Sequence, residues 1–219
     1  EAANLKAELQ RQGNQAIEVD ILEQPDRSSL TQALEQGHYH IFHYAGHSNP
    51  GEKGGKIYLV SRKTGLTETL SGDDLAGLIA NNNTQMVVFN SCRGAYSAQA
   101  GDRSGGQRSG DQYQGGERNL ANALIKRGIP AVLAMADRIP DDVALMLTQL
   151  FYRNLNQGFS IDLSLSRARQ GLISSFSSSQ LYWALPIFYL HPEFDGGLLS
   201  HTREDTDWLS PAGLYSLTP

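Results

Sequence analysis

The feature that most constrains this chain is an alternation of short, wholly apolar runs with longer amphipathic segments. Residues 85–91 contain a Met-Val-Val-Phe run, and residues 129–136 have the same apolar character. Such a strand places apolar side chains on both faces, as expected inside a parallel sheet that helices cover. Residues 141–156 instead repeat their apolar positions at helical spacing. This order predicts an α/β fold with a mostly parallel sheet.

The other expected elements follow from the same two periodicities. Ser71, with Asp74 three residues later, has the pattern of a capping box and opens a helix that reaches about residue 80. Ser160 is expected to cap a later helix. Further helices are predicted at residues 1–12, 27–36 and 117–127, and further strands at residues 15–22, 39–45, 57–60 and 183–190.

Size, charge and cysteine content limit the class of protein. A chain of 219 residues with 40% hydrophobic residues can bury the core of one domain, here expected over residues 1–219. A net charge of -5 argues against a nucleic-acid partner. The single cysteine excludes an internal disulfide and suits a reducing compartment.

Location and completeness are predicted from the same sequence. No stretch approaches the roughly 18 apolar residues of a membrane span, so no membrane partner and a cytoplasmic location are predicted. Because Glu1 opens an expected helix without an initiator Met, we expect the chain to be part of a longer protein.

One segment interrupts the regular pattern. Residues 94–116 hold seven glycines in 23 residues, with a near-repeat of five residues that begins at Arg103 and again at Arg108. Almost nothing in this segment is apolar enough to be buried, so a flexible surface loop is predicted.

Three of the predicted strands end next to residues that can carry chemistry. Residues 39–45 lead into His47, residues 85–91 into Cys92, and residues 129–136 into Asp137. The carboxyl ends of parallel strands meet at one edge of a sheet, where ligands bind in open α/β folds. If the three strands are neighbours, these side chains line one crevice.

A cysteine at such an edge can act as a nucleophile if a base activates it. The thiolate is the reactive form and is scarce at neutral pH, so His47 is the candidate base for Cys92. Gly94 lets the backbone bend after the nucleophile, and the backbone N–H groups of Cys92 and of a residue near Gly46, with Ser48 as a further candidate, are expected to face the developing oxyanion.

Several stretches resemble a known family. The Asn-Ser-Cys-Arg-Gly sequence around Cys92 resembles the caspase Gln-Ala-Cys-Arg-Gly box, and His47 lies 45 residues upstream, close to the roughly 50 of caspases. Similarity also covers Phe42-His43-Tyr44-Ala45-Gly46-His47, the passage 120–132, Ile139-Pro140-Asp141, Phe151-Tyr152 and Tyr182-Trp183-Ala184. Together these look like the CHAT family, caspase-like domains often associated with tetratricopeptide repeats, whose relatives include separase.

The resemblance implies a caspase-like three-layer sandwich, with helices on both faces of the sheet. It also implies a cysteine endopeptidase that forms a covalent acyl-enzyme without metal or cofactor, with His47 and Cys92 at the family's catalytic positions. The implied partners are a protein or peptide substrate and, for regulation, other segments of the parent protein or a regulatory protein. The chain departs from the family at Ser48, where many relatives have glycine. It also departs just before Ile139-Pro140-Asp141, where relatives tend to carry a tryptophan and this chain reads Ala136-Asp137-Arg138.

Substrate recognition and self-processing are further hypotheses. Asp137, with Asp141 nearby in sequence, could pair with a basic P1 side chain, as in separase-like relatives. The alternative is that these acids cap or favour the following helix. Arg103 and Arg108 lie where caspases carry their activation linker, so self-cleavage there is a hypothesis whose rival is an inconsequential insertion.

Two other functions remain open on the sequence. The fold could serve as a catalytically inactive scaffold that binds a peptide or protein partner. A metal-dependent hydrolase could use His38, His40, His43 and His47. The strand pattern disfavours the metal site because it places His43 on the face opposite to His38 and His40.

Overall fold

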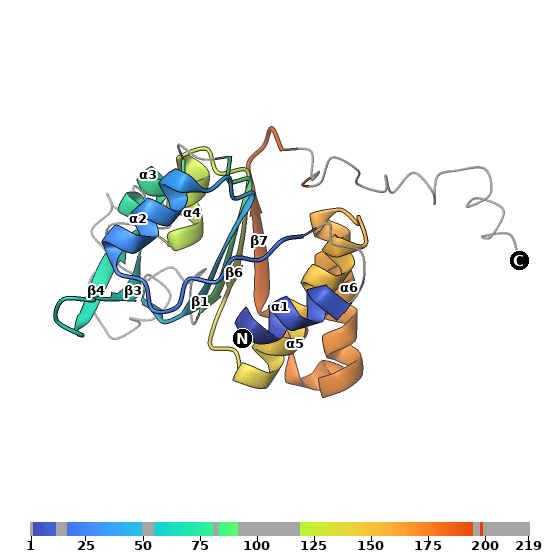
Figure 1. The fold of residues 1–219 in the computed structure, drawn as a ribbon. Helices are drawn as coiled ribbons and strands as arrows, with labels where there is room; N and C mark the ends of the chain where they lie inside the picture. Colours follow the sequence, from blue (N-terminus) through green and yellow to red (C-terminus); the bar gives the residue numbers. More distant parts are fainter. Residues whose placement is uncertain are drawn as a thin grey trace, which may run out of the picture. The chain divides into compact units, whose positions relative to one another are not determined.

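The computed structural model describes residues 2–11, 17–49, 55–80, 83–91, 119–194 and 198. The chain forms two compact units (Figure 1). The sheet unit comprises Leu22–Ile139 and Leu185–Glu193, and the helical unit comprises Glu1–Ile21, Pro140–Ala184 and Phe194–Pro219. The prediction of one domain over residues 1–219 stays a prediction.

A four-stranded sheet organises the sheet unit. Its order is β1-β5-β6-β7, with bounds Ile41–Gly46, Met86–Ser91, Ala131–Met135 and Pro186–Leu190. The pairs β1–β5 and β5–β6 are parallel, whereas β7 runs antiparallel to β6. The predicted mixed α/β architecture with a mostly parallel sheet is therefore confirmed.

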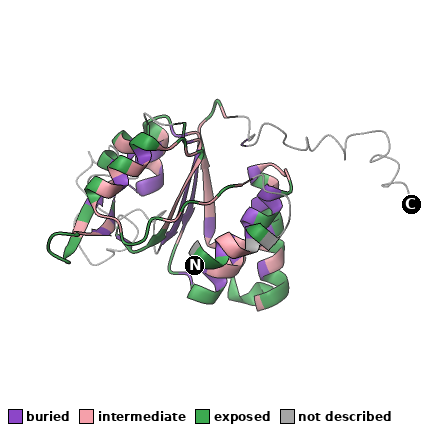
Figure 2. Ribbon diagram, in the orientation of Figure 1, coloured by how far each residue is buried: buried purple, intermediate pink, exposed green. Residues whose placement is uncertain are grey.

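The central strands hold the core of this unit. Every residue of β5 and β6 is buried (Figure 2), in agreement with their continuous apolar runs. Helices α2 (Arg27–Gln36), α3 (Gly72–Ile79) and α4 (Leu120–Lys126) lie together on one side of the strands (Figure 1). Their apolar stripes join the strands in one cluster, which includes Leu30, Leu34, Leu75, Ile79, Leu120, Leu124, Val87, Phe89 and Val132.

A second, smaller sheet of three antiparallel strands follows β1 in the chain. Strands β2 (Ser48–Asn49), β3 (Lys56–Val60) and β4 (Thr67–Ser71) pair in the order β2-β3-β4. The turn between β3 and β4 includes Gly65, which has a φ of 68° that side-chain-bearing residues rarely adopt. Because β2 begins at Ser48, the chain passes from one sheet to the other at His47.

Side-chain caps define where α2 and α3 begin. The carboxylate of Asp26 accepts from the backbone N–H of Ser29, and the hydroxyl of Ser29 is 3.2 Å from the backbone N of Asp26, which completes a capping box. The hydroxyl of Ser71 accepts from the backbone N–H of Asp74 at 3.1 Å, so the predicted cap of α3 is confirmed. These oxygens satisfy N–H groups that have no partner within the helix.

The helical unit contains α1 (Ala2–Arg11), α5 (Asp141–Asn156) and α6 (Ile161–Phe176), with short 3₁₀ turns η2 (Ser178–Gln180) and η3 (Tyr182–Ala184). Gly171 of α6 lets the helices approach closely, because a Cβ there would come 2.5 Å from Cδ1 of Leu150 in α5. The apolar stripe predicted for α5 is buried at Leu147, Phe151 and Leu155.

Two local predictions are wrong. Residues 17–22, the described part of the strand predicted at 15–22, form no strand. Residues 183–184 belong to the 3₁₀ turn η3, and β7 begins only at Pro186. Ser160 is the N-cap residue of α6, as predicted, although its side chain makes no capping hydrogen bond. Separately, none of the helices in the described part of the chain combines the length and hydropathy that a bilayer crossing requires.

Candidate active site

The three strands that carry the predicted site residues are neighbours. Strands β1, β5 and β6 run parallel and side by side, so their carboxyl ends share one edge of the sheet. The last Cα partners of β1 and β5 are Gly46 and Ser91. These residues directly precede His47 and Cys92 in the sequence, so the condition on which the predicted crevice depended is met.

The register also accounts for the spacing of the candidates in the sequence. A residue of β1 pairs with the β5 residue numbered 45 higher, as Ile41 does with Met86, and β5 pairs with β6 at the same offset, as Met86 does with Ala131. Residues 47, 92 and 137 are separated by the same 45 positions. The spacing of the three candidates in the sequence is thus the same as the offset of the two ladders.

The backbone of His47 is held by two tyrosines. Its carbonyl oxygen accepts from the Tyr44 hydroxyl at 2.7 Å and from the Tyr58 backbone N–H at 3.3 Å. The Tyr44 hydroxyl is also 2.9 Å from the Tyr58 carbonyl oxygen and accepts from the Tyr58 N–H at 3.2 Å. Its single proton can go to one carbonyl at a time. The network joins the end of β1 to β3, while the His47 residue itself is exposed.

Packing and burial keep Tyr44 suited to this role. Its ring meets the ring of Phe89 edge to face, with 6.4 Å between the centroids. Burial raises the pKa of the Tyr44 phenol, against the lowering effect of its bonds to the backbone of Tyr58 and His47. The hydroxyl therefore stays protonated and can donate.

Gly46 leaves room for the Tyr44 hydroxyl. A Cβ on Gly46 would lie 2.7 Å from the Tyr44 hydroxyl oxygen and 2.8 Å from its Cζ, closer than such atoms approach. Sequence reasoning proposed Gly46 as part of an oxyanion site through its backbone, and that role stays a prediction. The structure gives this glycine a packing reason of its own.

Ser48 and Ser91 connect the two strand ends directly. Their hydroxyl oxygens lie 2.8 Å apart in a buried hydrogen bond. The two residues are 5% and 3% exposed, so this bond is shielded from water. Ser48 follows His47 and Ser91 precedes Cys92, which places the bond beside the predicted dyad in the sequence.

The remaining predicted site residues are not brought together with His47 by any described contact. Cys92, Gly94, Arg103 and Arg108 lie outside the described residues. Asp137 is exposed just beyond β6, and its carboxylate accepts from the backbone N–H of Arg138 at 2.8 Å.

Asp141 belongs to the helical unit, where it is exposed in the first turn of α5 with Asp142. A carboxylate there interacts favourably with the helix dipole. Within the described part of the chain, no three His, Cys, Asp or Glu side chains gather as metal ligands.

Comparison with known proteins decides the family. The family model of the CHAT domain matches residues 1–191. The chain belongs to the CHAT domain family. No curated protein gave a match. CHAT domains are related to caspase-like proteases, and the mostly parallel sheet with its helices agrees with a caspase-like fold for this CHAT domain.

Sequence reasoning did not find the residues that hold the two strand ends. It considered Ser48 only for its backbone and did not single out Tyr44, Tyr58 or Ser91. Adjacency was the available signal, since Ser48 and Ser91 each neighbour a predicted catalytic residue. Their contact spans 43 residues and depends on the sheet register.

Proposed function

We propose that this CHAT domain is a cysteine endopeptidase in which Cys92 is the nucleophile and His47 its general base. The observation that carries the proposal is the parallel pairing of β1 with β5 up to Gly46 and Ser91. Neighbouring strands lie about 4.8 Å apart, so the backbones leading into His47 and Cys92 start side by side. The membership of a caspase-related family supports the same assignment.

The proposed reaction needs only these two side chains and backbone donors. His47 takes the thiol proton, and the Cys92 thiolate attacks the scissile carbonyl carbon while backbone N–H groups stabilise the oxyanion. The imidazolium then protonates the departing amine, which leaves an acyl-enzyme. Water, deprotonated by His47, attacks the acyl carbon and releases the carboxylate product and the thiol.

Loss of either side chain tests the dyad. We expect Cys92→Ala to abolish cleavage of a mixed fluorogenic peptide library, and His47→Ala to lower kcat by about 10²–10⁴-fold because general-base catalysis is lost. His40→Ala, which removes an exposed histidine just before β1, is the matched control and should retain activity.

Labelling with a peptide carrying an electrophilic ketone separates the peptidase from an inactive scaffold. We expect one adduct on Cys92, found by mass spectrometry, because an activated thiolate attacks such a group. A folded wild-type protein that stays unlabelled and cuts no peptide would favour the alternative, a caspase-like scaffold that binds a peptide or protein partner.

A basic P1 side chain is proposed for the substrate, recognised by Asp137. This carboxylate is exposed beyond the end of β6, and β6 is the strand next to β5. We expect Asp137→Asn to lower kcat/KM for Arg and Lys reporter peptides by about 10- to 100-fold, the value of a charge-assisted hydrogen bond, with little change for a Leu reporter.

The matched control for this prediction is Asp142→Asn. It removes an exposed carboxylate from the first turn of α5 and should leave both reporters unchanged. Best cleavage of an Asp reporter by the wild-type protein would refute the basic preference.

A further inference from the structure

The buried bond between Ser48 and Ser91 lies where the chain leaves one sheet and enters the other. Ser91 is the last residue of β5, and Ser48 is the first residue of β2. Their hydroxyls are 2.8 Å apart and shielded from water. A hydroxyl–hydroxyl bond of this kind ties together two backbone segments that belong to different sheets.

We propose that the Ser48–Ser91 hydrogen bond positions His47 against Cys92, which makes both serines positioning residues of the active site. The inference rests on the proposed peptidase function. His47 is then held from two sides: the Tyr44 and Tyr58 bonds fix its carbonyl group, and the Ser48 side chain anchors the residue that follows it. Ser91 anchors the residue that precedes Cys92.

The chemistry of the pair gives the side chain of Ser48 a role that a glycine could not fill. A glycine would leave the Ser91 hydroxyl without this partner in a buried position, which is unfavourable. With Ser48 present, the two strand ends share one bond, and any drift of the His47 segment away from β5 must break it. Small displacements of catalytic groups lower rates strongly.

The reactivity of the thiol gives a direct measurement. Cys92 is the single cysteine of the chain, so alkylation by iodoacetamide reports on that residue alone. An imidazolium nearby lowers the pKa of a thiol below its usual value of about 8.5. We expect Ser48→Ala and Ser91→Ala each to move the pH profile of alkylation upward and to lower kcat by roughly 10- to 100-fold, with KM little changed.

Three comparisons complete the design. The double variant Ser48→Ala with Ser91→Ala is expected to be no slower than the worse single variant, because both single changes break the same bond. Ser48→Thr and Ser91→Thr keep the hydroxyls and are expected to restore the wild-type profile. Ser28→Ala, at an exposed position of α2, is the control and should match the wild type.

The possible outcomes separate the two proposals. If wild-type Cys92 alkylates like an ordinary thiol and no peptide is cut, the peptidase proposal fails and the positioning role fails with it. If the wild-type profile is shifted but the alanine variants share it and lose only thermal stability, the serines are merely structural and the inference alone is overturned. Thermal unfolding of each variant shows that the measured protein is folded. If a single variant does not fold, the double variant, which removes both hydroxyls, is used to decide whether the serines have a positioning role.

Discussion

His47, the proposed general base, is fixed through its backbone. The carbonyl oxygen of His47 receives two hydrogen bonds, one from the Tyr44 hydroxyl and one from the Tyr58 backbone N–H. The ring of Tyr44 is in turn packed against Phe89 of the neighbouring strand, and Gly46 leaves space for its hydroxyl. The hydroxyl of Tyr44 thus ties the end of β1 to β3, and its ring packs against β5.

Tyr44→Phe tests this link at the level of one oxygen atom. The phenylalanine keeps the ring packing but removes the hydrogen bond to His47, so we expect the free energy of unfolding to fall by about 1 kcal/mol and kcat to fall with it. Chemical denaturation and peptide cleavage measure the two effects. Tyr182→Phe, in the helical unit, is the control, and equal kcat values for wild type and Tyr44→Phe would contradict the role.

The same substitution predicts a pH effect. Because burial raises the pKa of Tyr44 above 10.0, the folded state favours the neutral phenol. The contribution of this group to stability is complete below pH 10 and is lost as the pH rises through its raised folded pKa. The stability of the wild-type protein should therefore fall more steeply above pH 10 than that of Tyr44→Phe, as measured by denaturant unfolding at each pH.

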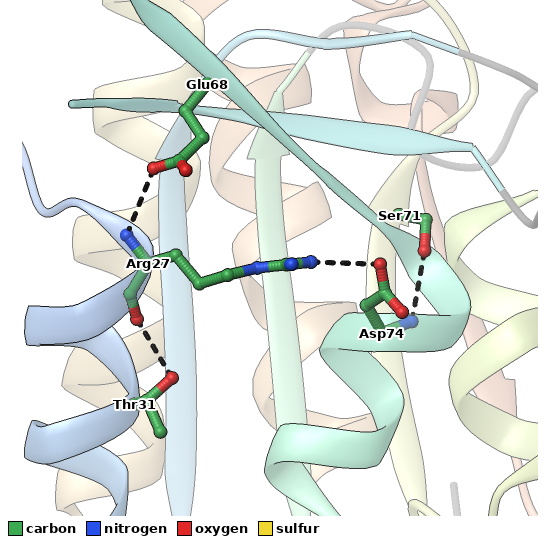
Figure 3. A network of polar contacts seen from close by, with 5 residues as sticks. All are labelled: Arg27, Thr31, Glu68, Ser71 and Asp74. Atoms are coloured by element: carbon green, nitrogen blue, oxygen red, sulfur yellow. Dashed lines mark hydrogen bonds and ion pairs between the residues drawn. The ribbon is translucent and has the colours of Figure 1, made fainter. Parts of the chain in front are cut away.

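At the scale of elements, the N-termini of α2 and α3 are joined by polar contacts (Figure 3). Arg27 forms an ion pair with Asp74 at 2.9 Å, and its backbone N–H donates to Glu68 at 3.4 Å. The side chains of Arg27 and Asp74 are 48% and 59% exposed, so water screens the pair and it contributes at most about 1 kcal/mol. The cap of α3 by Ser71 is the more dependable contribution to stability.

Ser71→Ala measures this cap. The change leaves the backbone N–H of Asp74 without its side-chain acceptor, so we expect a loss of about 1 kcal/mol in the free energy of unfolding. Ser28→Ala makes the same chemical change at an exposed position inside α2 and should stay within about 0.5 kcal/mol of the wild type. Identical losses in the two variants, by urea denaturation, would argue against the cap.

Elements with two agreeing local signals were predictable from the sequence. The helices α2, α3 and α5 carry both an apolar stripe and an end signal, and β5 and β6 have apolar runs too short for helices. Residues 17–22 showed only one signal, the alternation of apolar with polar residues. Their exposure does alternate as predicted, with Ile17, Val19 and Ile21 the less exposed residues. A strand also requires a hydrogen-bonded neighbour, and no described strand pairs with these residues.

The candidate site was predictable only to the level of single residues. His47 follows a strand whose end the sequence marks, but the bonds of its neighbours link residues that are distant in sequence. Ser48 contacts Ser91, and Tyr44 contacts Tyr58, because of the registers of two sheets. A register is set by tertiary packing, so periodicity along one strand cannot supply it.

At the scale of the whole molecule, the segment that carries Arg103 and Arg108 connects two neighbouring parts of one core. It lies between β5 and α4 in the sequence, and Phe89 of β5 shares the core cluster with Leu120 and Leu124 of α4. Strands β5 and β6 are also hydrogen-bonded partners. A chain cut at this segment would therefore give two fragments that both contribute to the same core.

We predict that the purified protein cuts itself after Arg103 or Arg108 and that the two fragments stay associated. Burial of the shared core favours their association over separation. Intact-mass spectrometry should find fragments that end at these arginines in the wild type and full-length chain in Cys92→Ala, while both proteins elute alike on gel filtration. Arg138→Ala, which removes an exposed arginine elsewhere, is the control and should be cut as the wild type is. Identical intact masses for wild type and Cys92→Ala would dispose of self-processing, and fragments that separate on gel filtration would show that the β5–β6 ladder needs a continuous chain.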